Sequence, residues 1–466
     1  MRRMALVSGL IAAGAASAWF SRGSRRSPKN AGRDLPTASL SDTMAVVTQV
    51  VGPVFAKGVL IRRRPVVAMA ERTNLELRAV RVLQRLLHEY GSGPLMLRLP
   101  VPQAVILSPQ HVHRVLAETP EPFATETREK RAALSHFEPQ NVLISHGGDR
   151  ADRRRFNEEV LELPCPVHSL SDSFAAVVQE EIADLLAASE AKQDFGWKQF
   201  SRVWFRIVRR VILGDGARDD RELTALLWRL RADANWAFLR PRRHRLRKRF
   251  YARLRAHLAR CEAGSLAALI ARTPTTARTM PEDQVAHWLF ASDPVGMTTY
   301  RALALLAAHP DQLQRAQQDI RSAAEGSKYL PLLRATLLEA LRLWPTTPTI
   351  LRQTTQNTEW ETGTMPAGTT ILIFAPFFHR DDQRLPYAHS FAPDIWLERP
   401  AAGGWPIIPF SAGPGVCPGS NLVLLLGSLV MAEVLRTRKL KLSEPTRLNP
   451  GNLPATFDHY TMRFSA

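Results

Sequence analysis

Close to its end the chain reads Phe410-Ser411-Ala412-Gly413-Pro414-Gly415-Val416-Cys417-Pro418-Gly419, a cysteine set in a loop of glycines and prolines. The run that follows, Leu422 to Ala432, carries no charge and predicts a buried helix. The positive N-terminal end of such a helix would face the sulfur and favour a thiolate. Glycine also lets a backbone approach a flat ligand closely. Cys417 is therefore a candidate ligand-binding thiolate, and the alternative is a reduced cysteine in a turn.

The loop resembles the cysteine signature of the cytochrome P450 family, F-x-x-G-x-[R/H]-x-C-x-G, and Phe410, Gly413, Cys417 and Gly419 match it. The resemblance implies that Cys417 is the proximal iron ligand of haem b, iron protoporphyrin IX. A thiolate in that position favours cleavage of the O–O bond. The basic residue that reaches a haem propionate in relatives is replaced here by Gly415. Propionate binding is therefore expected to come from elsewhere.

A second match lies in LPLLRATLLEALRLWPTTP, where Glu339 and Arg342 are three residues apart among leucines. On a helix they face one side and can pair. They match the family's E-x-x-R motif, which implies a structural pair. The segment FAPDIW at 391–396 resembles the family's F-x-P-x-R-[F/W] segment, with Ile395 in the arginine position. The usual three-way network is thus expected to be incomplete unless Arg380 or Arg399 substitutes.

Three further arginines match positions that bind haem propionates in relatives. Arg352 corresponds to a strand arginine, and Arg150 and Arg154 to helix positions. Arg150 and Arg154 are four residues apart and can point the same way. The alternative for this arginine run is a solvated helix face.

The distal helix of the family usually reads [A/G]-G-x-[D/E]-T-[T/S], and its acid and threonine support proton delivery to dioxygen. Counting back from Pro310 aligns Ala291 with the glycine, Asp293 with the acid and Pro294 with the threonine. A second alignment, shifted by five residues, would use Gly296, Thr298 and Thr299. We prefer the first. Since proline has no hydroxyl, our hypothesis is that Asp293 and ordered water carry protons, aided by Thr298 or Thr299. The alternative is that Asp293 only caps a helix segment.

The predicted fold is mainly α with a minor β region, and the resemblance implies the cytochrome P450 fold. We expect residues 44–466 to form that domain and residues 1–43 to be an N-terminal extension. Periodicity predicts strands at 95–99 and 104–107 and a β-hairpin at 357–374, with residues 376–409 irregular. Helices are predicted at 75–90, 109–118, 150–162, 170–188, 199–213, 220–238, 243–271, 281–308, 331–343 and 419–436.

The formal net charge of +19 is concentrated in two stretches, residues 1–33 and 240–260, which contain no acidic residue. Without a nucleic-acid-binding signature, a solvated basic face or contact with anionic lipid is favoured over nucleic-acid binding. The apolar run at 4–20 predicts a weak membrane anchor, a mis-assigned start before Met44 or, ranked lower, a signal peptide. Three cysteines argue against a disulfide framework, and Cys165 and Cys261 are expected to be buried. The predicted location is cytoplasmic, with membrane association left open.

The implied function is a haem-thiolate monooxygenase that inserts one oxygen atom of O2 into an apolar small molecule. A separate ferredoxin- or flavodoxin-type electron donor is implied. A basic surface on this protein would attract such a donor if the donor is acidic. One alternative is a peroxide-dependent peroxygenase, although relatives with proline at the threonine position precede it with arginine and not with an acid. Another is a non-catalytic haem-binding sensor. The expected substrate-facing residues lie near 123–145 and at Phe290, Ala291, Val295, Thr347, Thr349 and Ile350.

Overall fold

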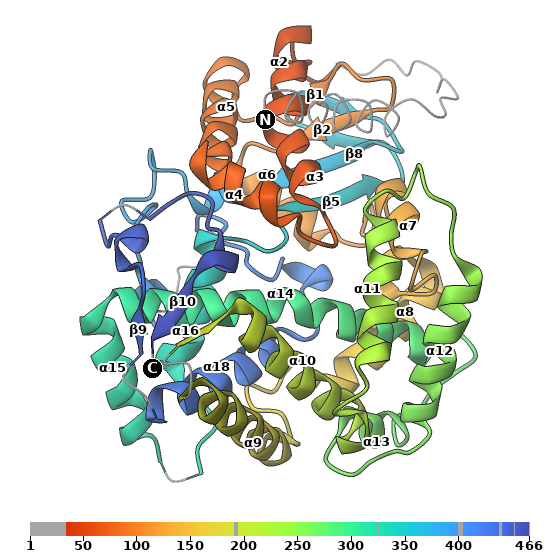
Figure 1. Ribbon diagram of the computed structural model, residues 1–466. Coiled ribbons are helices and arrows are strands. Elements are labelled where there is room, and N and C mark those ends of the chain that lie inside the picture. Colours follow the sequence, from red (N-terminus) through yellow and green to blue (C-terminus); the bar gives the residue numbers. More distant parts are fainter. Residues whose placement is uncertain are drawn as a thin grey trace.

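The computed structural model describes residues 34–190, 194–324, 326–398, 404–437, 440–451 and 453–465. Helices dominate, and the longest, α14, crosses the middle of the molecule (Figure 1). The other long helices are α5 (Leu75–Tyr90), α8 (Gly147–Val160), α9 (Ser171–Glu190), α10 (Trp197–Leu213), α11 (Arg221–Ala234), α12 (His244–Leu258), α15 (Pro310–Ser322), α16 (Pro331–Leu343) and α18 (Ser420–Thr437), and α14 spans Pro281–Ala308. The shorter helices are α2 (Leu40–Ala45), a π-helical turn (Val46–Val51), α3 (Gly52–Lys57), α4 (Arg64–Arg72), α6 (Pro109–Ala117), α7 (Arg128–Leu134), α13 (Leu266–Ile270) and α17 (Ala375–His379).

The main sheet has the strand order β1-β2-β8-β5-β3. Its strands are β1 (Leu95–Leu97), β2 (Gln103–Val105), β3 (Phe123–Ala124), β5 (Thr349–Thr354) and β8 (Thr370–Phe374). Only β2 and β8 run parallel, and every residue of the central strand β8 is buried. Two small sheets contain β6 (Thr358–Trp360) with β7 (Gly363–Met365), and β4 (Asp194–Gly196) with β10 (Arg463–Ser465) and β9 (Lys441–Leu442). The fold is thus mainly α with a minor β region, as predicted.

Several element boundaries differ from the prediction. The expected hairpin at 357–374 is a β6–β7 hairpin followed by β8, which belongs to the main sheet. The expected helix 243–271 is broken into α12 and α13, because Cys261 and Gly264 adopt positive φ. Cys165 and Cys261 are exposed, so their predicted burial is wrong. Both lie at turns, where a side chain has little to pack against.

The core is built on α14, which packs against α10, α16 and α18. The helix continues through Pro294. Next to this proline, Trp204 of α10 donates its indole N–H to the carbonyl of Ser292 at 2.7 Å. A Cβ at Gly296 would lie 2.7 Å from that indole ring, so glycine is needed for the close approach.

Residues 34–43, which the sequence assigned to the extension, pack on the main sheet. Thr37 forms a β-bridge with Met96, and Leu35 and Ala38 are 4% and 0% exposed. Asp42 accepts hydrogen bonds from Arg85 and Tyr90 of α5. The apolar run at 4–20 lies outside the described residues. Among the helices that the structure describes, none has the length and apolar character needed to cross a membrane.

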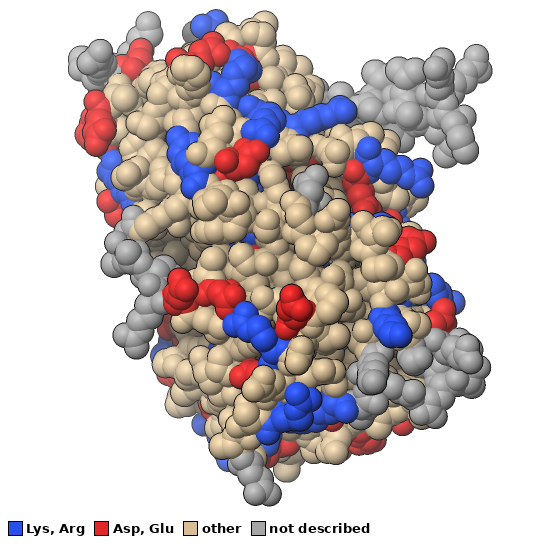
Figure 2. Space-filling model, turned by 90° about the vertical axis from the view of Figure 1, so that its left-hand side faces the viewer, with Lys and Arg blue, Asp and Glu red and all other residues tan. Residues whose placement is uncertain are grey.

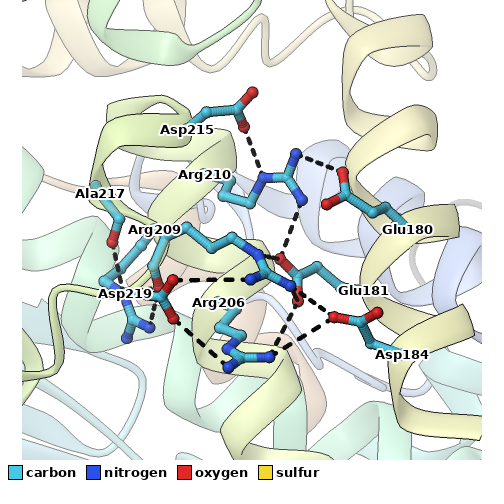
Figure 3. Close-up of polar contacts among 10 residues, drawn as sticks. Glu180, Glu181, Asp184, Arg206, Arg209, Arg210, Asp215, Ala217 and Asp219 are labelled. Carbon is cyan, nitrogen blue, oxygen red and sulfur yellow. Dashed lines mark hydrogen bonds and ion pairs between the residues drawn. The ribbon is translucent and has the colours of Figure 1, made fainter. Parts of the chain in front are cut away.

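Charged side chains also tie the helices together. Figure 3 shows arginines of α10 and of the following turn converging on acids of α9. Glu181, which is fully buried, receives Arg210 at 3.0 Å and Arg218 at 2.5 Å. Elsewhere basic and acidic side chains are interspersed, as on the face seen in Figure 2. Much of the positive charge of α12 is likewise paired, since Arg249, Arg253 and Arg255 contact acids.

Candidate functional site

Cys417 lies on the wall of a cavity of about 500 Å³ between the main sheet, α14 and α18. The loop that holds it is tight, because the Cys417 N–H donates to the carbonyl of Phe410 at 2.9 Å. Phe410 lines the same cavity. Gly413 adopts a φ of 61°, and a side chain there would collide with the backbone of Leu116 at the end of α6. Gly419 lines the cavity without positive φ, so of the loop glycines matched by the motif only Gly413 needs its conformational freedom.

The thiol of Cys417 responds to opposing influences. Burial raises its pKa, while the N–H of Gly419 and the positive charge of Arg154 lower it. The lowering by a backbone donor expected from the sequence is thus present, but burial outweighs it. Coordination to a metal ion deprotonates a thiol outright. The loop therefore suits a metal-bound thiolate better than a free one.

Four basic side chains line the cavity with this loop, namely Lys130, Arg150, Arg154 and Arg352. Arg352 of β5 is 3% exposed, and burial together with the charge of Arg150 lowers its pKa to about 10. Burial also lowers the pKa of Lys130 well below its ordinary value, and the charge of Arg352 adds to this effect. Within the described part of the chain, Glu129 is the one acid in the lining. The cavity wall thus has a net excess of positive charge.

This excess fits the two propionates of the haem implied by the sequence. The buried Nε of Arg150 has no hydrogen-bond partner among the described residues, and its Nη2 reaches only the carbonyl of Pro414, at 3.4 Å. Arg154 forms an ion pair with Glu158 and donates to the carbonyl of Val416 at 2.6 Å, which keeps it against the cysteine loop. An anionic group with carboxylates would satisfy these donors and neutralise the charge. Arg150, Arg154, Arg352 and Lys130 are the residues that would hold it.

The absence of a basic residue at 415 has a structural reason. A Cβ at Gly415 would lie 2.7 Å from Nη2 of Arg352 and 3.3 Å from Thr119. Arg352 is fixed there by hydrogen bonds to the hydroxyls of Thr119, at 3.0 Å, and Ser411, at 3.3 Å. The guanidinium of Arg352 therefore fills the space that a side chain at 415 would need. The positive charge that relatives place at the position of Gly415 comes here from Arg352.

Glu339 and Arg342 of α16 form a fully buried, bidentate pair with N–O distances of 2.6 and 2.8 Å. The carboxylate also accepts from the backbone N–H of Ala392, at 2.8 Å, and the indole of Trp396, at 2.9 Å. Trp396 thus supplies the donor expected from an arginine at 395. Arg380 does not substitute, because it donates to the carbonyls of Leu343, Leu453 and Pro454 and contacts His389. Arg399 lies outside the described residues.

The α14 positions on the cavity wall favour the first alignment of the distal helix. Ala291 and Pro294 line the cavity, whereas Gly296 and Thr299 do not. Thr298 also lines it and donates its hydroxyl to the carbonyl of Pro294 at 2.9 Å. The side chain of Thr299 donates to the carbonyl of Val295 at 3.0 Å.

Asp293 is held away from this wall. Its carboxylate accepts from Nη2 of Arg231 at 2.7 Å, and Asp293 is not among the residues that line the cavity. Arg231 comes from α11, is 3% exposed and also donates to the carbonyl of Leu60 at 2.6 Å. Of the three predicted proton-handling residues, the structure therefore brings only Thr298 to the cavity.

The remaining wall is largely apolar. All six residues expected to face a substrate line the cavity: Phe290, Ala291, Val295, Thr347, Thr349 and Ile350. Sequence reasoning missed Lys130, whose ammonium donates to the carbonyls of Thr125 and Leu351 at 2.7 and 3.0 Å. It also missed His287, which lines the cavity and contacts Glu138 at 3.0 Å. Neither belongs to a motif, and only the packing of distant segments brings them to the site.

Comparison with known proteins agrees with this geometry. The family model for cytochrome P450 matches residues 284–455, which include most of α14, the Glu339–Arg342 pair and the cysteine loop. Cyclooctat-9-en-7-ol 5-monooxygenase of Streptomyces melanosporofaciens is 33% identical over 174 residues, covering 34% of this chain and 37% of that protein. Methyltetrahydroprotoberberine 14-monooxygenase of Papaver somniferum is 30% identical over 171 residues, covering 34% and 32%. The matched part thus spans about a third of the length of these curated relatives.

Solved structures extend the likeness to most of the chain. The retinoic acid-bound cyanobacterial CYP120A1 gives a TM-score of 0.65 at 16% identity, covering 82% of this chain and 93% of that one. A zebrafish cytochrome P450 with abiraterone gives 0.62 at 20% identity, covering 78% and 92%. At these identities the structures establish the fold, while the sequence match covers the C-terminal part with the cysteine loop. The chain therefore has the cytochrome P450 fold, and its residues 284–455 match the family model for cytochrome P450, a family whose cofactor is haem b.

Proposed function

We propose that this protein is a haem-thiolate monooxygenase that inserts one atom of dioxygen into an apolar small molecule. The observation that supports this most strongly is the cavity itself, in which Cys417, a net positive end and a largely apolar wall meet. Haem bound at Cys417 would supply the redox chemistry of dioxygen activation. The protein's own residues would bind its propionates, orient the substrate and limit access of water.

Electrons are proposed to come from a separate ferredoxin- or flavodoxin-type protein. The net charge of +19 complements the acidic surface of such carriers. We also propose that the hydroxyl of Thr298 and water in the cavity handle protons. Asp293 would take part only by releasing Arg231 or acting through water, because the ion pair of 2.7 Å holds its carboxylate. An Asp293→Asn variant with undiminished turnover would rule out a role for that carboxylate.

The spectrum of the reduced, carbon monoxide-bound protein tests the thiolate, because its Soret band distinguishes thiolate from imidazole or water ligation. We expect thiolate ligation in the native protein and its loss in Cys417→Ser. A native protein that binds no haem would overturn the proposal. Turnover with reductant, surrogate ferredoxin and O2, compared with turnover by peroxide alone, then separates a monooxygenase from a peroxygenase. Haem binding without any oxidation under either condition would favour the sensor.

A further inference from the structure

A second, small cavity of about 40 Å³ lies beside the main one and is lined by an unusual set of buried charges. Lys57 at the end of α3, Arg62 in the following loop and Arg301 of α14 line it, together with a single carboxylate, Glu76 of α5. Lys57 and Arg301 are 7% and 8% exposed. Three cations thus face one anion in a largely buried space, which is costly unless a further negative charge is present.

The protein itself satisfies only part of this charge. Lys57 forms an ion pair with Oε1 of Glu76, and Arg62 donates to the carbonyls of Gly58 and Thr346. Arg301 donates to the carbonyl of Trp344 at 3.0 Å. Beyond the lining, the negative charge of the buried Asp458 acts on Arg301. Arg64 lies over the ring of Tyr460, and Asp293 is paired with Arg231. The surroundings therefore offset only part of the excess, and the cavity keeps a net positive charge.

Unpartnered donors point to the kind of ligand that would fit. Arg301 contacts Nδ1 of His459 at 3.3 Å, and since arginine only donates, that ring nitrogen is the acceptor. The remaining proton of a neutral His459 then lies on Nε2, which is buried and has no partner among the described residues. Nε of Arg301 and the hydroxyl of Thr456 are also buried without a partner there, against one unpartnered acceptor, Oε2 of Glu76. Donors and positive charge together favour an anion.

We propose that this cavity binds one small anionic group, a carboxylate or a single inorganic anion such as chloride. Its volume of about 40 Å³ would hold roughly three waters. Waters would satisfy the hydrogen bonds but not the charge. Thr346 lines both cavities, so a carboxylate at the end of an apolar molecule in the main cavity would reach the smaller one. This source rests on the proposed function, whereas binding of a free anion does not.

The first test measures the binding of acetate, nitrate and bromide to the haem-loaded protein, by thermal unfolding and calorimetry at constant ionic strength. Losing one charged donor costs about 1.5–3 kcal/mol, so Arg301→Gln should weaken binding by about tenfold or more. Arg64→Gln, which removes the same charge from an exposed position, should change it less than about twofold. Equal binding to Arg301→Gln and the native protein, or no binding to the native protein, would overturn the proposal.

A second measurement needs no variant. Crystals of the native protein grown with bromide should show an anomalous peak between Lys57, Arg301 and His459, and a cavity filled by water alone would contradict the proposal. Long-chain carboxylic acids and the matching alcohols then distinguish the sources, read from the haem spectral shift. Tighter binding of the acid, lost in Arg301→Gln, identifies a substrate carboxylate. Equal binding of both, with bromide still bound, identifies a free anion and leaves the proposed function intact.

Discussion

At the residue scale, the positions of Gly415 and Arg352 explain how this chain dispenses with the basic residue that the motif usually places before its cysteine. The guanidinium arrives from β5 and occupies the missing side chain's space, 2.7 Å from where a Cβ would lie. Charge at this end of the cavity is therefore retained although the motif position has lost it. The basic residue that the sequence lacks at position 415 is thus replaced in the structure by Arg352.

We predict that Gly415→Arg weakens the site instead of restoring it. The new side chain would displace Arg352 from Thr119 and Ser411 and place two guanidinium groups in one space. Overpacking of this kind costs about 1–3 kcal/mol of unfolding free energy, measured by urea denaturation, and haem retention on gel filtration should fall. Combining it with Arg352→Thr should recover much of the loss. If Gly415→Arg alone kept native stability and haem content, the conclusion that Arg352 fills the space of a side chain at 415 would be wrong.

A second residue-scale prediction concerns Glu138, which is fully buried and contacts His287. His287, but not Glu138, lines the main cavity. Burial raises the pKa of this carboxyl from 4.5 to about 7, although His287 and Arg231 oppose the rise and Asp283 supports it. The folded state therefore holds the proton more tightly than the unfolded chain. Its contribution to stability is complete below pH 4.5 and is lost as the pH rises through 7.

The expected loss between these pH values is about 3 kcal/mol, from 1.36 kcal/mol for each pKa unit. Glu138→Gln mimics the protonated form and should flatten this part of the profile, measured as unfolding free energy by urea denaturation from pH 5 to 8. Exposed Glu118 provides the control, since Glu118→Gln should leave the slope unchanged. Native and Glu138→Gln proteins with parallel profiles would show that the carboxyl does not titrate in this range.

At the scale of elements, periodicity located the long helices well and the irregular regions poorly. The bounds of α5 and α14 were predicted to the residue, because each begins or ends at a turn signal that the sequence displays. The helix that was predicted as continuous from 243 to 271 was wrong, since positive φ at Cys261 cannot be read from a cysteine. The helices between 40 and 72 were missed because they are short and are stabilised by packing on α5 and by the apolar cluster that they share with the sheet.

The charge network in Figure 3 links helix α9 to helix α10. Glu181 is its centre, with Arg210, Arg218 and Arg206 around one fully buried carboxylate. Glu181→Gln would leave these guanidinium groups without their buried partner and should cost about 3 kcal/mol in urea denaturation. Asp184, which is 52% exposed in its side chain, is the matched control, and Asp184→Asn should cost less than about 1 kcal/mol. Equal losses would mean that burial of Glu181 does not matter.

At the scale of the whole molecule, the motifs predicted the thiolate loop and the Glu339–Arg342 pair, but not the surroundings that make a site of them. Lys130 lies on α7 and His287 on α14, and only the folding of the chain brings both to the wall of the same cavity. Asp293 is the opposite case, a residue that the motif placed at the site but that the structure holds away from it. Its position in the motif did not reveal the ion pair with Arg231 of α11. Sequence motifs identify candidate ligands of a cofactor, whereas long-range packing decides which other side chains reach the same cavity.

The last prediction concerns where the folded body begins. Leu35 and Ala38 lie in the same apolar cluster as the main sheet, and the N–H of Ala38 donates to the carbonyl of Met96 at 2.8 Å. Removing residues 1–43 would expose this edge of the sheet and release Arg85 and Tyr90 from Asp42. Burial of one leucine side chain alone is worth about 2 kcal/mol, so the truncated protein should unfold several degrees earlier. Removing residues 1–33 serves as the control and should preserve the melting temperature, because the packed segment then remains. If both truncations melt alike, residues 34–43 contribute nothing measurable and the boundary at Met44 stands.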